Sequence, residues 1–389
     1  MADEDPEKSS LSLEVEGNRL AFIPAGPDRL DALIALVHGA QRSLRILFYI
    51  FKEDDSGRRV RDALLAACSR GVKVSLLVDG FGSEFVRGAF FQPLIDSGCR
   101  FCRFEPRWGR RYLLRNHQKL ALADDQRVLA GGFNVADDYF GTADQKAWRD
   151  LGVQLDGPAA APLGAYFDDI FAWSQRKRSS MRELRRILER HSQHEGRLRW
   201  LFGGPVPRLS PWARTLRMDM VQASRLDLIA AYFAPNRAML RRICDTALHG
   251  GVRIVTAAKS DNGATIGAAR HTYWRLLRRG VKIFEYQPTK LHTKLIIVDD
   301  KVHVGSGNFD VRSLYLNVEM MLRIEDAALA ASLRGFVEGE IAQSEEVSLA
   351  FHKARRTWFN RLKWALCYFI VATMDYNVTR RLNFGVARA

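Results

Sequence analysis

An internal repeat is the feature of this sequence that most constrains its fold. A strand-like segment at 43–51 (SLRILFYIF) precedes a helical pattern and a second strand at 60–80 (VRDALLAACSRGVKVSLLVDG). The same order returns at 225–235 (RLDLIAAYFAP) and 239–260 (MLRRICDTALHGGVRIVTAAKS). Strand and helix patterns that alternate in this way are typical of layered α/β units, so we expect two copies of one such unit.

The repeat continues into a polar motif. Residues 116–134 read NHQKLALADDQRVLAGGFN and residues 291–309 read LHTKLIIVDDKVHVGSGNF, with 292 − 117 = 175 residues between their histidines. A lone histidine on an apolar strand is most often a core residue, whereas two matched motifs indicate a functional site. The positions that recur are His117, Lys119, Asp124 and Asn134 in the first copy and His292, Lys294, Asp299 and Asn308 in the second.

The spacing within each motif separates two kinds of side chain. On a strand, residues two apart face the same side, so each histidine points with its lysine. An imidazole can be a nucleophile or a proton carrier near neutral pH, and an ammonium group suits phosphate oxygens. Asn134 and Asn308 would add neutral donors to the same anion. Asp124 and Asp299 lie five residues after their lysines and face the opposite way, so we expect them to fix the hairpin or the packing between the halves.

The two motifs differ in length by one residue. Asp124 precedes Asn134 by ten residues, whereas Asp299 precedes Asn308 by nine. A shorter turn at 299–301 would leave the side chains of both flanking strands on the same faces of the sheet as in the first motif. We therefore expect the missing residue to lie in this turn. A loss within a strand would instead turn Asn308 away from the site.

The charge of the chain points to an anionic partner. Its 59 Lys and Arg residues against 44 Asp and Glu residues give a net charge of +15. Such a surface attracts polyanions, and both nucleic acid and an anionic membrane leaflet fit this description.

Cysteine usage and the N-terminal segment bear on location. Five scattered cysteines favour reduced thiols in the cytoplasm. Cys99 and Cys102 form a lone C-x-x-C in an alternating run, and we interpret them as strand residues on opposite faces rather than a redox or metal pair. The N-terminus has no apolar region of the signal-peptide type, and no stretch reaches the roughly 18–20 apolar residues of a spanning helix.

The paired motifs carry a family resemblance. HQKLALAD and HTKLIIVD both fit HxKxxxxD, and with GGFN and GSGN behind them they resemble the paired signature of the phospholipase D superfamily over about residues 20–345. The segments AGGFNVADDYFG, WRDLGVQLDGPA and RSLYLNVE resemble bacterial cardiolipin synthases, especially the short type without N-terminal transmembrane helices. The resemblance implies two pseudo-symmetric α/β/α sandwich domains with mixed sheets and an active site at their interface.

The repeat and the composition together predict domain boundaries. We expect a flexible N-terminus at 1–18, a first phospholipase D-like domain at 19–175, a basic connector at 176–200, a second such domain at 201–345, and a basic and aromatic C-terminal membrane-interface segment at 346–389. The connector reads as a helix with a solvated basic face, with contact to anionic lipid or phosphate as the alternative.

The resemblance also implies a mechanism. One histidine attacks phosphorus to form a phosphohistidine, and the other protonates the leaving alcohol and then deprotonates the incoming one. The family's common order assigns the nucleophile to His117 and the acid and base to His292. The lysines and asparagines would hold the phosphoryl oxygens. No cofactor or metal is expected.

Each imidazole needs a carboxylate that sets its tautomer. The family places this acid on a later strand, and the matching residues are Asp150 in WRD and Glu319 in LNVE. They lie 33 and 27 residues after the histidine of their own half. The alternative is that both are ordinary surface carboxylates.

The C-terminal segment at 351–385 is informative for a lipid enzyme. Basic residues flank a core rich in Trp, Phe, Tyr and Leu, which suits an amphipathic segment in a lipid headgroup region. A packed terminal helix that closes the second domain explains the same apolar core. The basic residues are Arg355, Arg356, Arg361, Lys363, Arg380 and Arg381.

The resemblance leads to a functional hypothesis with two alternatives. A cardiolipin synthase would transfer a phosphatidyl group from phosphatidylglycerol to a second phosphatidylglycerol and release glycerol. Its partners would be anionic phospholipid (phosphatidylglycerol, cardiolipin) and the membrane surface, with no obligate protein partner and no nucleic acid. It would lie peripherally on the cytoplasmic side of the bacterial inner membrane. The alternatives are a phosphodiesterase that hydrolyses phospholipid or nucleic acid, and a lipid-binding module without activity.

Overall fold

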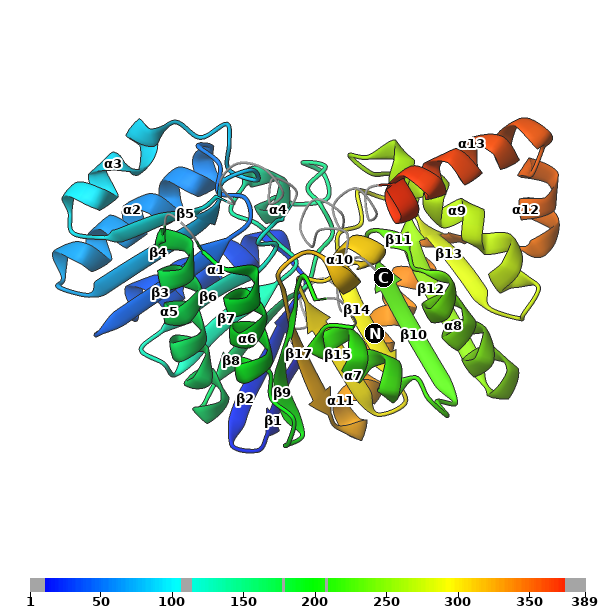
Figure 1. Ribbon diagram of the computed structural model, residues 1–389, viewed down its shortest axis with the longest axis horizontal. Helices are drawn as coiled ribbons and strands as arrows, with labels where there is room; N and C mark the ends of the chain where they lie inside the picture. The colour runs from blue at the N-terminus through cyan, green and yellow to red at the C-terminus, as the bar shows by residue number, and fades with distance from the viewer. Residues whose placement is uncertain (1–10, 106–113, 177–178, 207–208, 375–389) are drawn as a thin grey trace, which may run out of the picture.

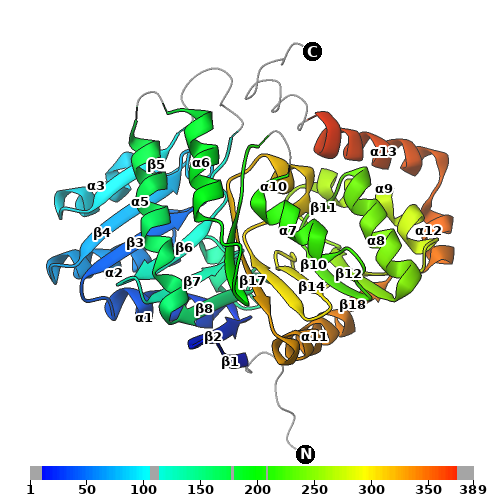
Figure 2. The same ribbon diagram turned by 60° about the horizontal axis from the view of Figure 1, so that its bottom comes forward.

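The computed structural model describes residues 11–105, 114–176, 179–206 and 209–374. Each half of the chain forms an eight-stranded mixed sheet, and the two halves lie side by side with helices packed on their sheets (Figures 1 and 2). This arrangement confirms the expected fold class of two α/β units.

The first sheet has the strand order β1-β2-β8-β7-β6-β3-β4-β5. Strands β3, β4 and β5 run parallel because α2 and α3 connect them, and the other neighbours are antiparallel. The elements are β1 (Leu11–Val15), β2 (Asn18–Ile23), α1 (Gly26–His38), β3 (Ser43–Phe48), α2 (Asp55–Ser69), β4 (Lys73–Asp79), α3 (Gly88–Asp96), β5 (Arg100–Phe104), β6 (Lys119–Ala123), β7 (Arg127–Gly131), α4 (Asp137–Phe140), β8 (Gly152–Asp156), the 3₁₀ turn η1 (Pro158–Ala160) and α5 (Pro162–Gln175).

The second sheet has the order β18-β13-β12-β10-β14-β15-β17-β9. Helix α6 (Met181–His191) leads into this half. The elements that follow are β9 (Leu198–Gly203), α7 (Pro211–Asp219), β10 (Arg225–Ala230), β11 (Phe233–Ala234), α8 (Arg237–His249), β12 (Gly251–Ala257), α9 (Gly263–Leu277), β13 (Lys282–Tyr286), β14 (Lys294–Val298), β15 (Lys301–Gly305), β16 (Phe309–Asp310), α10 (Val311–Tyr315), β17 (Glu319–Glu325), α11 (Ala327–Ala342), β18 (Ser344–Glu346), α12 (Leu349–Arg355), α13 (Trp358–Tyr368) and the π-helical turn η2 (Phe369–Met374).

The topology repeats as the sequence predicts. The order β2-β8-β7-β6-β3-β4-β5 of the first sheet matches β9-β17-β15-β14-β10-β12-β13 of the second, with the parallel strands in the same places. The additional strands β1 and β18 lie at the ends of the two sheets. The repeat therefore extends over seven strands of each half.

The two halves share one hydrophobic core. Leu120 and Leu122 of β6 and Leu295 and Ile297 of β14 belong to this shared core. The alternate residues of β6, such as Ala121, face a separate core beneath α1, α2 and α3, and the second half has a corresponding core of its own. Strands buried on both faces explain the continuous apolar runs in the sequence.

The structure corrects two expected boundaries. The flexible terminus was expected to reach residue 18, but Leu11–Val15 forms β1, because Glu16 and Gly17 adopt positive φ angles of 49° and 71° and turn the chain back along β2. Residues 1–10 lie outside the described part of the chain. The basic connector was expected to reach residue 200, but β9 of the second sheet begins at Leu198.

The connector helix α6 is only partly solvated. It buries Leu184, Ile187 and Leu188 in the shared core, while Arg182 and Arg186 are exposed. Its apolar stripe and basic face match an amphipathic helix that packs on a protein core.

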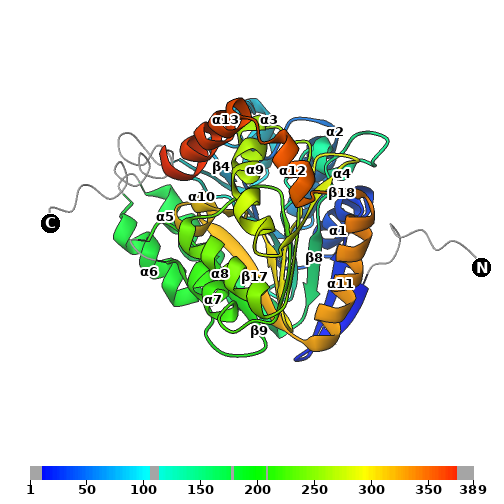
Figure 3. The same ribbon diagram turned by 90° about the vertical axis from the view of Figure 1, so that its right-hand side faces the viewer.

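The C-terminal helices lie over the second half. Helix α13 packs against α9, and α12 lies next to both (Figure 3). Within the described ranges, no helix combines the length and the apolar character that crossing a membrane requires.

Candidate active site

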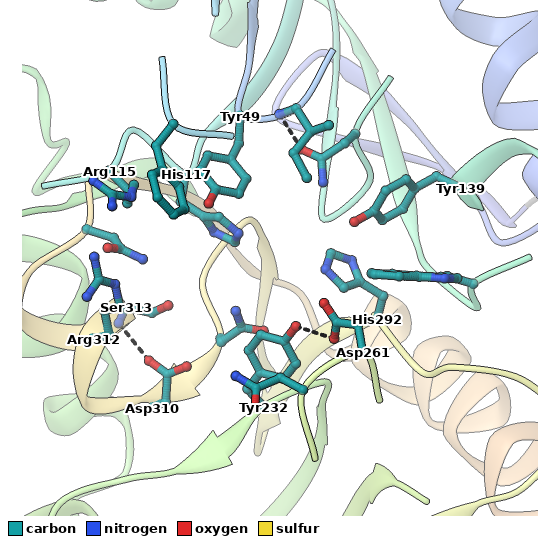
Figure 4. Close-up of a pocket in the computed structure, with 17 residues that line it drawn as sticks. Tyr49, Arg115, His117, Tyr139, Tyr232, Asp261, His292, Asp310, Arg312 and Ser313 are labelled. Atoms are coloured by element: carbon teal, nitrogen blue, oxygen red, sulfur yellow. Dashed lines mark hydrogen bonds between the residues drawn. The ribbon is translucent and has the colours of Figure 1, made fainter. Parts of the chain in front are cut away.

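Both histidines open into one cavity of about 420 Å³ between the two halves. The cavity lies where β3 and β10 end and where β6 and β14 begin, because antiparallel neighbours bring these ends to the same edge of each sheet. Its lining comes from both halves (Figure 4). The lining residues are Tyr49, Ile50, Phe81, Arg115, His117, Asn134, Tyr139, Trp148, Tyr232, Asp261, Asn262, His292, Asn308, Asp310, Arg312, Ser313 and Asn317.

Each imidazole is hydrogen-bonded to a carboxylate from the opposite half. Nδ1 of His117 lies 3.1 Å from Oε2 of Glu319, and Nδ1 of His292 lies 2.6 Å from Oδ2 of Asp150. The sequence had placed each acid with the histidine of its own half, and the structure corrects this pairing. Both carboxylates are fully buried, so neither is an ordinary surface residue.

Backbone hydrogen bonds build the crossed arrangement. The amide of His117 donates to the carbonyl of Val318 (2.8 Å), and the amide of His292 donates to the carbonyl of Arg149 (2.6 Å). Val318 and Arg149 directly precede the two acids. A short bridge between the halves therefore places each carboxylate beside the imidazole of the other half.

Each motif lysine is hydrogen-bonded to the backbone of the histidine two residues before it. Nζ of Lys119 donates to the carbonyl of His117 at 2.6 Å, and Nζ of Lys294 donates to the carbonyl of His292. Nζ of Lys294 also lies 2.9 Å from Nδ1 of His292. That nitrogen is closer to Asp150, so we assign its proton to the bond with the carboxylate.

Both motif asparagines reach the cavity. Oδ1 of Asn134 accepts a hydrogen bond from the amide of Ile50 (3.0 Å), which leaves its amide nitrogen as the donor toward the pocket. Asn308 lines the same pocket and is buried.

The missing residue of the second motif lies in the turn. The first hairpin pairs Ala123 with Arg127, whereas the second pairs Val298 with Lys301. A three-residue turn is thus replaced by a two-residue turn. Because the strands keep their facing, Asn308 reaches the cavity despite the shorter motif.

The motif aspartates lie at the hairpin tips and do not line the cavity. The carboxylate of Asp124 accepts hydrogen bonds from the amides of Gln41, Arg42 and Ser43 (2.9, 2.7 and 2.9 Å). Oδ1 of Asp299 accepts equivalent bonds from the amides of 224 and 225. Each aspartate therefore attaches its hairpin to the loop before the first parallel strand of its half.

Burial determines the charge state of the site. It lowers the pKa of His117, and it lowers that of His292 to about 3. It also lowers the pKa of Lys119 well below its usual value and that of Lys294 to about 8. Burial alone would raise the pKa of Asp150, but the charge of Lys294 and the hydrogen bond with His292 outweigh it and the pKa is lowered. Both imidazoles are therefore neutral at pH 7, and the Asp150 carboxylate beside His292 is ionised.

The two carboxylates are supported differently. Gly132 leaves room for Asp150, since a Cβ atom at Gly132 would lie 2.5 Å from the Oδ1 atom of that acid. The matching residue of the second half is Ser306, whose hydroxyl donates to Oε2 of Glu319 at 2.5 Å. Asn317 donates to the other oxygen of Glu319 at 3.4 Å.

The pseudo-symmetry breaks in the walls of the cavity. Tyr139 and Trp148 lie against His292, with ring centroids 5.0 and 5.3 Å from the imidazole. The positions that match these rings in the second half hold Ser313 and Asn317, which are smaller and polar. Two aromatic rings therefore lie against His292, whereas His117 has the ring of Tyr49 at 4.9 Å and polar side chains at the matching positions.

The His117 side is more open and more basic. The side chain of His117 is 12% exposed, against 6% for His292. Arg115 and Arg312 line this side of the cavity, whereas Tyr139 and Asp261 line the side of His292 (Figure 4). Sequence reasoning missed these wall residues because they lie outside the repeated motif, in the short helices α4 and α10 and in loops. Their one signal was proximity to it, since Arg115 precedes His117 by two residues.

Comparison with known proteins identifies the family of this chain. The family described as cardiolipin synthase, PLD-like domain matches residues 33–170 and 218–339, which are the two halves of the site. Cardiolipin synthase A of Pseudomonas fluorescens is 30% identical over 344 residues, covering 85% of this chain and 70% of that protein. Cardiolipin synthase B of Salmonella typhimurium is 30% identical over 373 residues, covering 91% of this chain and 87% of that protein.

A solved structure shares the fold. The crystal structure of phosphatidylserine synthase from Haemophilus influenzae superposes with a TM-score of 0.72 at 15% identity, covering 96% of this chain and 97% of that one. The family match covers well over half of the chain and includes both histidines and both of their carboxylate partners. The chain therefore belongs to the cardiolipin synthase family, whose members are enzymes built from phospholipase D-like domains.

Proposed function

We propose that this protein synthesises cardiolipin from two molecules of phosphatidylglycerol and releases glycerol. The observation that carries the proposal is the pair of histidines in one cavity, each hydrogen-bonded to a buried carboxylate of the opposite half. A phosphodiester between them would have an imidazole on each side, which is the arrangement that double displacement at phosphorus needs. The match to cardiolipin synthases over most of the chain supports the choice of lipid.

In the first step, Nε2 of His117 attacks the phosphorus of phosphatidylglycerol. A phosphorus–nitrogen bond forms, the bond to the glycerol oxygen breaks, and His292 donates its Nε2 proton to that oxygen. The negative charge of the bound lipid raises the pKa of His292 and so favours the imidazolium form that this step needs. Asp150 stabilises the imidazolium through Nδ1.

In the second step, the released glycerol is replaced by a second phosphatidylglycerol. His292 takes the proton of its terminal hydroxyl, and the oxygen attacks phosphorus while the bond to His117 breaks. Lys119, Lys294 and the two asparagines would hold the phosphoryl oxygens through both steps. Two phosphatidylglycerol molecules thus give one cardiolipin and one glycerol.

The proposed place of action is the cytoplasmic face of a bacterial inner membrane. A net charge of +15 suits an enzyme whose substrate and product are both anionic lipids. The five cysteines are all free, which is compatible with a reducing compartment.

The proposal is tested by product analysis. Purified protein is incubated with phosphatidylglycerol vesicles and, separately, with single- and double-stranded DNA. We expect cardiolipin and glycerol in equal amounts from the wild type, none from His117→Ala, and intact DNA. Phosphatidic acid as the sole lipid product would identify a hydrolase, and cut DNA without a lipid product would identify a nuclease. Equal inactivity of wild type and His117→Ala on every substrate would favour a binding module.

A further inference from the structure

Large exposed apolar side chains gather on the C-terminal helices. Six of the thirteen such side chains in the described part of the chain fall within 358–370. They recur at helical spacing along one face of α13 and the start of η2. Their exposed fractions are 76% for Trp358, 60% for Phe359, 63% for Leu362, 56% for Leu366, 51% for Phe369 and 37% for Ile370. We call these six residues the apolar ridge.

The opposite face of α13 is firmly packed. Gly267 of α9 allows close approach, because a Cβ atom there would lie 2.7 Å from the Sγ atom of Cys367. Trp364 stacks on His352, and the hydroxyl of Tyr368 donates to the carbonyl of Pro235 at 2.7 Å. The orientation of α13 is therefore fixed by its inner face, and the apolar ridge faces solvent. The inner face behaves as the packed terminal helix expected from the sequence, and the membrane-interface reading of the outer face stays a prediction.

Basic side chains border the apolar ridge. Arg361 and Lys363 are exposed within α13, and Lys353 and Arg355 are exposed just before it. A surface with an apolar centre and cationic edges is complementary to a bilayer that contains anionic phospholipid.

The segment that carries the apolar ridge ends beside the rim of the active-site cavity. Ala372 of η2 packs with Val311 of α10, and the next residue, Arg312, lines the cavity. On the side of the first half, Phe81 lines the cavity and is 46% exposed, and Phe85 in the same β4–α3 turn is 95% exposed. Figures 1 and 3 place α3 and α13 along one edge of the molecule, with α4 and α10 between them in Figure 1.

We infer that the apolar ridge and Phe85 are two contact points on the surface of an anionic phospholipid bilayer, one on each side of the cavity. In this orientation the cavity opens toward the lipid headgroups, so a phospholipid can enter without leaving the membrane entirely. These contact points define the surface of the site that faces the lipid, and the identity of that lipid rests on the proposed function.

The main test compares Leu362→Glu/Leu366→Glu with Leu248→Glu. Leu248 on α8 is 59% exposed and lies outside both contact points, so it controls for a surface charge change. Binding to vesicles of phosphatidylglycerol and phosphatidylcholine is measured by co-sedimentation. We expect the double variant to bind at least about tenfold more weakly, because two leucines lose their burial in the interface, and the control to bind as wild type.

A second measurement separates docking from catalysis. Short-chain, monomeric phosphatidylglycerol does not require a membrane surface, so cardiolipin formation from it should be equal in wild type, double variant and control. Formation from vesicles should fall only in the double variant. If the proposed function is wrong, the wild type will produce no cardiolipin from either lipid form, while the binding comparison remains valid.

Phe85→Ser provides an independent variant, because a side chain that is 95% exposed contributes little to folding. We expect weaker vesicle binding with an unchanged melting temperature. Wild-type vesicle binding by both Phe85→Ser and the double variant would overturn the inference. So would a shift from dimer to monomer in the double variant by light scattering, since the apolar ridge would then bind a second copy of the chain.

Discussion

Nδ1 of His117 lies 3.1 Å from Oε2 of Glu319, although 202 residues separate the two in the chain. The corresponding pair of His292 and Asp150 is 142 residues apart. Neither half of the repeat therefore contains a complete acid–histidine pair. The site exists only when both halves fold together around their shared core.

The crossed pairing predicts which histidine each carboxylate affects. In Glu319→Gln, the Nδ1 proton signal and tautomer of His117 should change in NMR spectra while those of His292 do not, and Asp150→Asn should do the reverse. Each variant should lower kcat/KM by roughly 10²–10⁴-fold, because the imidazole loses the group that orients it. A change at His292 in Glu319→Gln, with His117 unaffected, would refute the crossed arrangement.

Arg312 and the residue that matches it in the first half should differ in their effect on activity, because only Arg312 lines the cavity. Arg312→Gln should lower kcat/KM for phosphatidylglycerol about 10- to 100-fold, the value of a hydrogen bond to a charged group. The repeat-equivalent residue is Asp138, which is paired with Lys52 at the surface, so Asp138→Asn should change kcat/KM less than about twofold. Similar losses in both variants would contradict a specific role for the arginine.

The hairpin aspartates should affect stability and not chemistry. Asp124→Ala removes the acceptor of three backbone amides and should lower the free energy of unfolding by roughly 2–3 kcal/mol in urea titrations. Activity per folded molecule should stay within about twofold of wild type, since the carboxylate does not line the cavity. A stable but inactive Asp124→Ala protein would return this residue to the list of catalytic candidates.

The pKa of His292 predicts how stability depends on pH. The unfolded chain binds a proton at this residue near pH 6.5, whereas burial lowers the folded pKa to about 3. Between these values the unfolded state binds more protons, so the free energy of unfolding should fall as the pH is lowered. In His292→Asn this dependence should be weaker between pH 6.5 and 4, as measured by urea unfolding at several pH values. An unchanged slope would show that the folded histidine titrates normally.

The sequence was sufficient to predict features that depend on local rules, such as the direction in which a strand side chain points. Strand alternation placed the histidines with their lysines and turned Asp124 away, and the length of a turn decided whether Asn308 reached the site. The crossed carboxylates could not be predicted, because nothing in either repeat specifies how the two sheets face each other. The cavity walls were missed for a related reason, since the repeat has lost its similarity where they lie: Asp138 stands opposite Arg312, and Tyr139 stands opposite Ser313.

Phosphatidyl transfer through a phosphohistidine is the chemistry proposed for this protein, and a substrate with a good leaving group can reveal the intermediate. His292→Asn lacks the general acid, but phosphatidyl nitrophenol needs none, because nitrophenolate leaves unaided. We predict a burst of about one nitrophenol per protein and, by mass spectrometry after rapid quenching, a phosphatidyl group on the peptide that contains His117. Release of nitrophenol without a burst and without any histidine adduct would rule out a phosphohistidine intermediate.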